Sequence, residues 1–323
     1  MEQELKHLSD WLANKNQAAI AFVTKTWGSA PRQVGSLMVI REDSVFEGSV
    51  SGGCVEGSVI AEAANLIETR SNIKHLTFSV ANDDAWSVGL ACGGEIEILL
   101  VRVHDANISW LHDTRSTIDS RDRAVLTIDR QTGDIRHNGA SSDQTSHEKK
   151  PNQTDRFFYL PITPKPKIFI IGAVHITQHL CVMANECNFD ITVIDPREGF
   201  IDSREFKSAH IVADWPDDYF EKTNLDEHSA LVALTHDPKL DDPALVPALK
   251  SDAFYIGALG SKKTHNTRYE RLHNSGFKPL DIDRIHGPIG LDIGSKTPAE
   301  IAISIIAEIV QTYRQKLSIH HEI

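Results

Sequence analysis

Apolar and polar positions along the 323-residue chain form two different patterns, separated by a polar stretch. The stretch, NGASSDQTSHEKKPNQTDR (residues 138–156), has no apolar period and cannot bury enough surface to offset the entropy lost on ordering it. We therefore expect an N-terminal domain over residues 1–137, a polar linker and connecting strand over residues 138–164, and a further domain over residues 165–323.

The N-terminal part mixes short strand-like runs with two helical patterns. The predicted strands cover residues 18–26, 36–41, 76–80, 95–103 and 124–128, and the predicted helices cover residues 56–70 and 107–119. This mixture predicts an α+β domain.

After the polar stretch, apolar runs that end in turn residues alternate with helical segments. The runs are KIFIIGAV, DITVIDPRE, AHIVADW, SALVALTHD and AFYIGALGS. Such alternation is typical of parallel strands joined by crossover helices. The predicted fold class is therefore α/β: a C-terminal Rossmann-like doubly wound parallel sheet with an N-terminal α+β domain.

Charge and composition narrow the range of partners. The formal net charge of −12 disfavours nucleic acid, and no apolar stretch approaches the roughly 20 residues of a membrane span. The N-terminus, MEQELKHLSDWL, is acidic and amphipathic, unlike a secretory signal, so we expect a cytoplasmic protein. Its four cysteines lack CxxC spacing and are expected to be free thiols.

In doubly wound sheets, ligands bind beyond the carboxyl ends of the strands, where helix N-termini expose N–H groups. Gly172 matches the first glycine of G-x-G-x-x-G, but Val174 and Thr177 occupy the other two positions. This departure weakens the case for ordinary dinucleotide binding. Asp195, at the end of the next strand, has the spacing of a ribose-binding acid, although a plain turn aspartate before a proline fits equally well.

The segment YIGALGSKK has the features of an anion site. Gly257 and Gly260 predict a turn with exposed backbone, Ser261 is placed to cap a helix, and Lys262 and Lys263 would add positive charge at the helix N-terminus. Basic residues in a first helical turn oppose the helix dipole, which suggests a ligand-binding purpose. The alternative is two solvated lysines on a capped helix.

Three histidines follow predicted strands or lie in loops on the same edge: His175, His236 and His286. A metal site would require them to converge. The sequence favours polar lining of a cleft, and we assign no metal ligands.

Two cysteines stand beside paired glycines in the N-terminal part. SGGCVEG contains Gly52, Gly53, Cys54 and Glu56, and ACGGE contains Cys92 and Gly93. Cys54 would precede a helix whose positive end stabilises anions, and the glycines would let a bulky group approach the sulfur. We predict that the two thiols act as a pair in one site. The alternative is small residues in two tight loops.

The C-terminal segment begins with Thr297-Pro298-Ala-Glu300, which predicts a capped helix N-terminus. An apolar stripe from Ile301 to Ile309 follows. Because this stripe is longer and richer in isoleucine than a peripheral helix usually needs, we expect a homodimer.

Taken together, these motifs resemble the xanthine dehydrogenase accessory factor family, also called XdhC/CoxI. The resemblance covers most of the chain, through TWGSAPRQVGSLMVI, GSVSGGCVEGSV, ACGGEIEILL, VIDPREGF, YIGALGSKKTHNTRYERL and IHGPIGLDIGSKTPAEIAISIIAEIV. The sequence GAVHIT departs from the family, which usually has a second glycine before the histidine.

The resemblance implies a chaperone for the molybdenum cofactor (molybdopterin). Such a protein would hold the cofactor, present it to a cysteine desulfurase and insert it into the apoenzyme of a molybdenum hydroxylase. The sequence leaves open whether the Rossmann-like domain holds the pterin phosphate, a nucleotide or both. The candidate residues are Cys54 and Cys92 as the reactive pair, with Gly52, Gly53, Glu56, Gly93, Gly172, His175, Asp195, Arg197, His236, Gly257, Gly260, Ser261 and Lys262 as cofactor-binding residues.

Two other functions compete with this one. An NAD(P)-dependent oxidoreductase would use Asp195 for the ribose and a histidine as acid or base, but the glycine fingerprint is altered and no Tyr-x-x-x-Lys pairing is present. A redox or sulfur-transfer switch would use the two cysteines without a cofactor.

Overall fold

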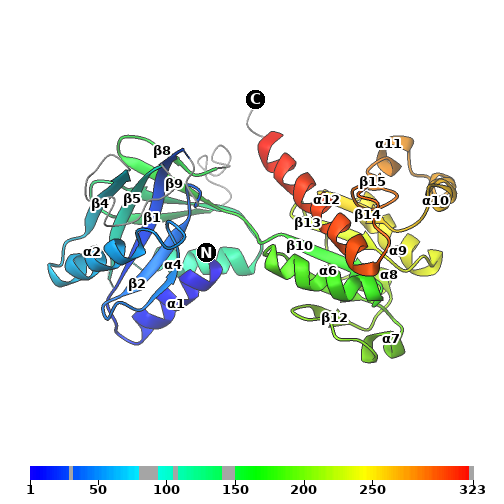
Figure 1. Ribbon diagram of the computed structural model, residues 1–323, viewed down its shortest axis with the longest axis horizontal. Coiled ribbons are helices and arrows are strands. Elements are labelled where there is room, and N and C mark those ends of the chain that lie inside the picture. Colours follow the sequence, from blue (N-terminus) through cyan, green and yellow to red (C-terminus); the bar gives the residue numbers. More distant parts are fainter. Residues whose placement is uncertain (29–31, 80–93, 105–107, 140–149, 320–323) are drawn as a thin grey trace. The chain divides into compact units, whose positions relative to one another are not determined.

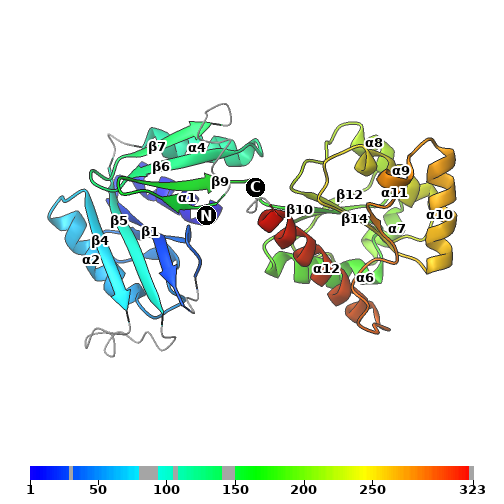
Figure 2. The ribbon, with the colours of Figure 1, turned by 90° about the horizontal axis from the view of Figure 1, so that it is seen from above.

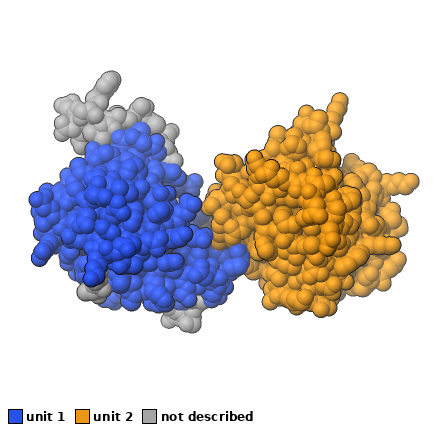
Figure 3. Space-filling model, turned by 90° about the horizontal axis from the view of Figure 1, so that it is seen from below, with its two compact units in different colours: residues 1–164 blue, residues 165–323 orange. Residues whose placement is uncertain are grey.

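The computed structural model describes residues 1–28, 32–79, 94–104, 108–139 and 150–319. The chain divides into two compact units, residues 1–164 (unit 1) and residues 165–323 (unit 2) (Figure 3). Each unit has hydrophobic cores of its own. None of the helices in these described ranges is both long enough and apolar enough to cross a bilayer.

Unit 1 contains a five-stranded and a four-stranded antiparallel sheet, with strand orders β3-β2-β1-β5-β4 and β7-β6-β9-β8. The described elements, in chain order, are α1 (Glu2–Ala13), β1 (Ala18–Trp27), β2 (Leu37–Arg41), β3 (Phe46–Gly48), α2 (Glu56–Glu68), β4 (Ile73–Ser79), β5 (Glu95–Val103), α4 (Ser109–Asp119), β6 (Ala124–Asp129), β7 (Ile135–Gly139), β8 (Asn152–Gln153) and β9 (Phe157–Ile162).

Strand β1 is the centre of unit 1, because both of its faces are covered. Ile20 and Phe22 pack in a core with α1, α4 and the four-stranded sheet, whereas Ala21 and Val23 pack in a second core with α2. Burial on both faces explains why the strand is a continuous apolar run, AAIAFV, with no alternation of polar residues.

The connecting strand expected after the polar stretch is β9, and it packs as part of unit 1. In β9, Phe158, Leu160 and Ile162 are buried, and the strand pairs with β6. Their alternation with less buried residues gives β9 one face in the core. Residues 140–149, from the middle of the polar stretch, lie outside the described residues.

Unit 2 is built on a six-stranded parallel sheet with strand order β12-β11-β10-β13-β14-β15. Its elements are β10 (Lys167–Ile171), α6 (His175–Glu186), β11 (Asp190–Ile194), α7 (Glu198–Asp202), β12 (His210–Val212), α8 (Pro216–Phe220), β13 (Ser229–Ala233), α9 (Pro238–Leu249), β14 (Tyr255–Ala258), α10 (Lys262–Asn274), α11 (Pro279–Ile282), β15 (Ile285–His286) and α12 (Pro298–Ile319). Numbered within the unit, this order is 3-2-1-4-5-6, the Rossmann order, so the predicted fold class is confirmed.

Helices cover both faces of this sheet, with α6 and α12 on one side and α8 and α9 on the other (Figures 1 and 2). In β10, Ile168 and Ile170 face α6 and α12, while Phe169 and Ile171 face α8 and α9. Burial on both faces again makes the strand almost wholly apolar.

The isoleucine stripe of α12 is used inside unit 2. Ile305 and Ile309 are fully buried against the sheet and α6, whereas Ile303 is 47% exposed. Since the stripe is covered within the same chain, it gives no support to the expected homodimer.

We predict that Ile305→Ala lowers the free energy of unfolding by about 2–5 kcal/mol, because it leaves a cavity in this core. The matched control, Ile303→Ala on the same helix, should change stability by less than about 0.5 kcal/mol. Urea unfolding followed by circular dichroism measures both, and equal effects would contradict the assigned burial.

Candidate functional site

The turns after β10 and β13 meet where the strand order of unit 2 reverses. Gly172 follows β10 with φ 111°, and a Cβ atom at this position would lie 2.7 Å from Cγ2 of Thr235, which follows β13. The Gly172 N–H donates to the carbonyl of Ile194 at the end of β11. Glycine is therefore required for these turns to pack closely, at the crevice where sheets of this type bind ligands.

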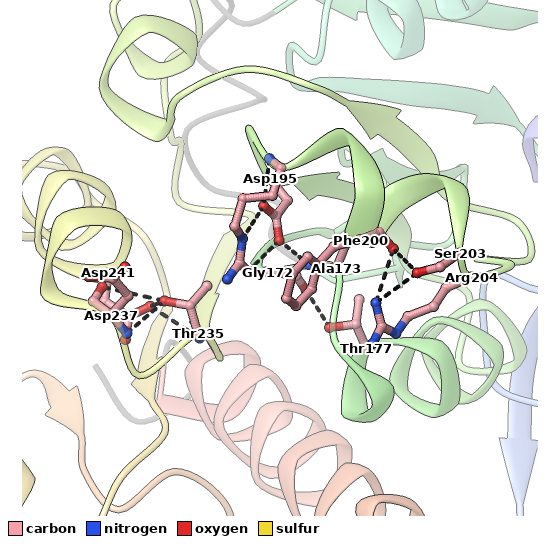
Figure 4. Close-up of polar contacts among 11 residues, drawn as sticks. Gly172, Ala173, Thr177, Asp195, Phe200, Ser203, Arg204, Thr235, Asp237 and Asp241 are labelled. Atoms are coloured by element: carbon pink, nitrogen blue, oxygen red, sulfur yellow. Dashed lines mark hydrogen bonds and ion pairs between the residues drawn. The ribbon is translucent and has the colours of Figure 1, made fainter.

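Asp195 is buried at the end of β11, and its carboxylate is fully occupied by protein donors (Figure 4). Oδ2 accepts from the Ala173 N–H at 2.8 Å and from Nη2 of Arg197 at 2.7 Å. Oδ1 accepts from the N–H and Nε of Arg197 at 3.0 and 2.8 Å. These bonds use all of the roughly four lone-pair sites of a carboxylate, so Asp195 has none left for ribose hydroxyls.

The Asp195 carboxylate is held in its charged form. Burial alone would raise its pKa, but hydrogen bonds from Arg197 and from the Ala173 N–H lower the pKa of Asp195 below its usual value. In turn, the hydrogen bond to Asp195 raises the pKa of Arg197. Asp195 and Arg197 therefore form a bidentate ion pair, with two parallel charge-assisted hydrogen bonds.

Arg197 exposes about a third of its side chain beside this buried acid. Its guanidinium carbon lies 4.0 Å from the centre of the Phe200 ring, and that of Arg204 lies 5.0 Å from the same centre. Nη1 of Arg197 makes no hydrogen bond to any residue that the structure describes. The end of β11 therefore presents oriented cationic groups, which suit a phosphate better than a sugar diol.

A second polar chain starts at Thr235. Its Oγ1 donates to Asp241 Oδ1 at 2.6 Å and accepts from the Asp237 N–H at 3.1 Å. Arg268 lies 3.7 Å from the other Asp241 oxygen and donates to the Leu259 carbonyl at 3.0 Å. Asp241 and Arg268 are both buried, and burial raises the pKa of Asp241. This series of polar contacts connects the turn after β13 to the turn after β14.

The YIGALGSKK turn follows β14. Ser261 caps α10 by accepting a hydrogen bond from the Thr264 N–H, and Lys262 is exposed in the first helical turn. Gly260 has φ 145°, and a Cβ atom there would lie 2.9 Å from Thr264. A Cβ atom on Gly257 would lie 2.6 Å from both Ile289 and the Tyr255 hydroxyl. Internal packing therefore accounts for Gly257. Gly260, Ser261 and Lys262 lie in the turn after β14, at the carboxyl edge of the sheet.

The three candidate histidines lie at different turns of this edge. His175 is exposed at the start of α6, and His236 is exposed after β13 with φ 61°. His286 ends β15, where its Nδ1 lies 3.1 Å from Glu308 Oε1. Across the described ranges, no group of three or more His, Cys, Asp or Glu residues is arranged to hold a metal ion.

In unit 1, the SGGCVEG loop is organised around Glu56 at the start of α2. Oε1 accepts from Ser49 Oγ and from the N–H groups of Val50, Ser51 and Gly52, at 2.7–3.2 Å. Oε2 accepts from Ser51 Oγ at 2.5 Å and from the Gly53 N–H at 2.9 Å. Although burial would raise the pKa of Glu56, bonds from Ser51 and Ser49 lower it to about 2.

These contacts give the paired glycines a structural role. Gly52 and Gly53 have φ values of 79° and 116°, which direct their N–H groups at Glu56. Cys54 is half-buried, and its N–H donates to Ser51 Oγ. Among the described residues other than the chain neighbours of Gly53, no atom lies within 4 Å of a Cβ atom built on Gly53, whereas the Cys54 side chain packs against the core that α2 shares with β1. Cys92 and Gly93 lie outside the described residues.

The other described cysteines, Cys181 and Cys187, are free thiols in unit 2. Cys181 is buried in α6, and burial raises its pKa to about 12. Cys187 is exposed after the same helix.

Sequence reasoning missed several residues of these sites. Phe200 stands three positions after Arg197 in VIDPREGF, a spacing that puts both on one side of a helical turn. Glu308 occupies a position seven residues after Ile301, where the apolar stripe predicts another apolar residue. For Thr235, Asp241 and Arg268 the sequence held no comparable signal, since their contacts join separate elements.

Comparison with known proteins assigns the family. A model of the XdhC Rossmann domain matches residues 168–309, and a model of the XdhC and CoxI family matches residues 11–79. The chain belongs to the XdhC and CoxI family.

Named relatives span nearly the whole chain. A probable subunit of the xanthine dehydrogenase of Bacillus subtilis is 26% identical over 322 residues, covering 94% of this chain and 96% of that protein. The molybdenum cofactor insertion chaperone PaoD of Escherichia coli is 25% identical over 306 residues, covering 94% and 86%. A crystal structure of a xanthine dehydrogenase from Bacillus halodurans, 24% identical, has the same fold with a TM-score of 0.77, covering 97% and 96%.

We predict that Glu56→Gln destabilises unit 1 at neutral pH by about 2 kcal/mol, because an amide cannot accept from both Ser51 and Gly53 through its nitrogen. A carboxylate with a depressed pKa stabilises the fold above its ordinary pKa and ceases to do so as the pH falls towards the folded-state pKa of about 2. The difference in melting temperature between wild type and variant should therefore shrink from pH 6 to pH 3. A constant difference would contradict a charged Glu56.

Proposed function

We propose that this protein binds the molybdenum cofactor, presents it to a cysteine desulfurase for sulfuration, and inserts it into the apoenzyme of a molybdenum hydroxylase. Family membership and the resemblance to PaoD support a role in maturation. The cofactor is cargo in this proposal. The structural observation that supports cofactor binding is the arrangement of Asp195 and Arg197 at the end of β11.

In a Rossmann site for NAD, the acid at this position accepts bonds from ribose hydroxyls. Here Asp195 is enclosed, and Arg197 takes the position nearest the solvent. The exposed guanidinium fits the phosphate that molybdopterin carries. The first turn of α6, where Val174 makes no side-chain cap, adds N–H groups at the same edge.

One observation favours a second candidate. An arginine near the end of the second strand also accommodates the 2′-phosphate of NADP, so an NADP-dependent oxidoreductase fits Arg197. Val174 in the glycine turn argues against it, because close approach of a pyrophosphate to the backbone needs glycine there. Titration with NADP⁺ separates the two functions, since a cofactor chaperone requires no NADP⁺ binding.

We predict that Arg197→Gln weakens binding of the molybdenum cofactor by at least about tenfold, because a charge-assisted contact to its phosphate is lost. Glutamine can still donate to Asp195, which limits damage to the fold. The probe is cofactor released from a purified molybdenum hydroxylase, titrated against the full chain and followed by fluorescence.

Lys250→Ala is the matched control, because it removes the same charge from the far end of α9. It should leave the affinity unchanged. Equal affinity of wild type and Arg197→Gln, with both melting normally, would remove Arg197 from the site.

The paired cysteines are the second part of the proposal. Thiolates are soft ligands that suit the metal end of the cargo better than oxygen ligands do. Cys54 is half-buried in a loop whose shape is fixed by Glu56, and its side chain packs against the core that α2 shares with β1, so its position is fixed by the fold.

We predict that Cys54→Ala and Cys92→Ala each reduce the activity of a co-expressed molybdenum hydroxylase about tenfold or more, while thermal melting stays normal. The double variant should be no worse than either single variant, since removing one member of a unit already disables it. Cys187→Ala, at an exposed cysteine of unit 2, is the control. Full hydroxylase activity with the double variant would show that both cysteines only pack within their loops.

A further inference from the structure

The Phe200 ring of α7 has two arginine side chains against it. The guanidinium carbon of Arg197 is 4.0 Å from the ring centre and that of Arg204 is 5.0 Å from it. The two guanidinium carbons are therefore at most 9.0 Å apart, the sum of these two distances. Figure 4 shows Arg204 next to Phe200. One aromatic side chain thus holds two cations close together.

The charges of these two arginines are compensated differently. Arg197 forms its bidentate ion pair with Asp195. Arg204 donates through Nη1 to the Phe200 carbonyl at 3.2 Å and to Ser203 Oγ at 3.1 Å, and both of these acceptors are neutral. Arg204 forms no ion pair with any residue that the structure describes, and its buried Nε makes no hydrogen bond there. The fold therefore leaves the charge of Arg204 without an acid.

Acidic residues are present in the same segment. Glu198, Asp202 and Glu205 stand close to Arg204 in the sequence, yet none of the three forms an ion pair with it in the described structure. Two neighbouring guanidinium groups repel each other, and an acid beside Arg204 would offset that repulsion. The contacts with Phe200 hold both guanidinium groups in place but leave their positive charge intact. An anion that comes from outside the chain would supply the missing negative charge.

Both arginines lie at the ends of the same two neighbouring strands. Arg197 follows β11, which pairs with β10 in the sheet. The segment that carries Arg204 is bonded to α6, the helix that follows β10, because Nε2 of Gln178 donates to the Glu205 carbonyl at 3.3 Å. A single small group can therefore contact both arginines without crossing other strands of the sheet.

Two guanidinium groups at this separation suit a phosphate that carries two negative charges. A phosphate oxygen accepts from a guanidinium N–H at about 2.8 Å, so one phosphate group can lie between two guanidinium groups that are this close. A phosphate monoester carries about two negative charges at pH 7, because its second pKa is about 6. A phosphate diester carries one. The second cation therefore favours a monoester over a diester.

We propose that Arg204 and Arg197 together bind the phosphate monoester group of the ligand, with the Phe200 ring positioning both guanidinium groups. This inference rests on the proposed function, which places the phosphate of the ligand at Arg197. It adds a second binding residue and names the class of phosphate ester that the site selects. A purely structural role for Arg204 would end at its packing against Phe200.

The deciding variant is Arg204→Gln, which removes the second cation. We expect about tenfold weaker binding of the molybdenum cofactor by the full chain, with a normal melting temperature. The matched control is Lys207→Gln, because it removes an exposed cation from the same segment, and it should bind as wild type does. Equal losses in the two variants would overturn the inference, since they would reflect net charge alone.

A matched pair of small probes tests the selection between phosphate esters. Phenyl phosphate is a monoester, and methyl phenyl phosphate is a diester of similar shape. In NMR titrations of the full chain at pH 8, the wild type should bind the monoester at least about fivefold more tightly than the diester. Arg204→Gln should lose most of this preference, and Lys207→Gln should keep it. A merely structural role for Arg204 would not change the ratio of the two affinities.

The outcomes are distinct. Weaker cofactor binding by Arg204→Gln together with a lost preference for the monoester supports the inference. Normal cofactor binding by Arg204→Gln, or an unchanged preference, overturns it while the proposed function stands. If the wild type binds phenyl phosphate but not the cofactor, the proposed function fails, and the ratio measured with Arg204→Gln decides the inference. If the wild type binds neither, both fail.

Discussion

The arrangement of the strand ends at the carboxyl edge of the unit 2 sheet depends on one buried carboxylate, that of Asp195. Its four hydrogen bonds join Ala173, just after β10, to Arg197, just after β11. One carboxylate therefore fixes two strand ends. A buried ionised carboxylate without these donors would be strongly disfavoured. The positions of the Gly172 turn and of Arg197 are therefore coupled. The charge that faces the solvent is that of Arg197, because Asp195 is fully buried.

Unit 1 uses the same physical device in a different loop. Glu56 is also buried and charged, and the chain wraps four consecutive N–H groups, those of residues 50–53, around it. The conformation of the Cys54 loop is thus set by an anion that belongs to the protein. The Cys54 side chain adds packing contacts with the core that α2 shares with β1.

The pattern of apolar residues was sufficient to predict the parallel sheet, because strands buried on both faces are continuous apolar runs. The capped start of α12 was equally legible, and Thr297 and Glu300 do exchange the expected hydrogen bonds. The sequence could not predict which groups the acids near glycines would bond to. Glu56 and Asp195 carry the spacing of ligand-binding groups, yet both bond to their own loops, and only three-dimensional packing shows which partner is left facing the solvent.

That these acids bond to their own loops, rather than face the solvent, has a chemical consequence for an acidic protein. At a net charge of −12, an anionic ligand is repelled at long range, so it can be held only where cations or N–H donors are fixed locally. Enclosing Asp195 within the fold removes its carboxylate from the surface and leaves its partner Arg197, about a third exposed, on the solvent side. In the proposed site, the buried acid orients Arg197, and Arg197 contacts the ligand. Replacing an enclosed acid should therefore alter ligand binding through the geometry of its partner, whereas replacing the partner removes the contact itself.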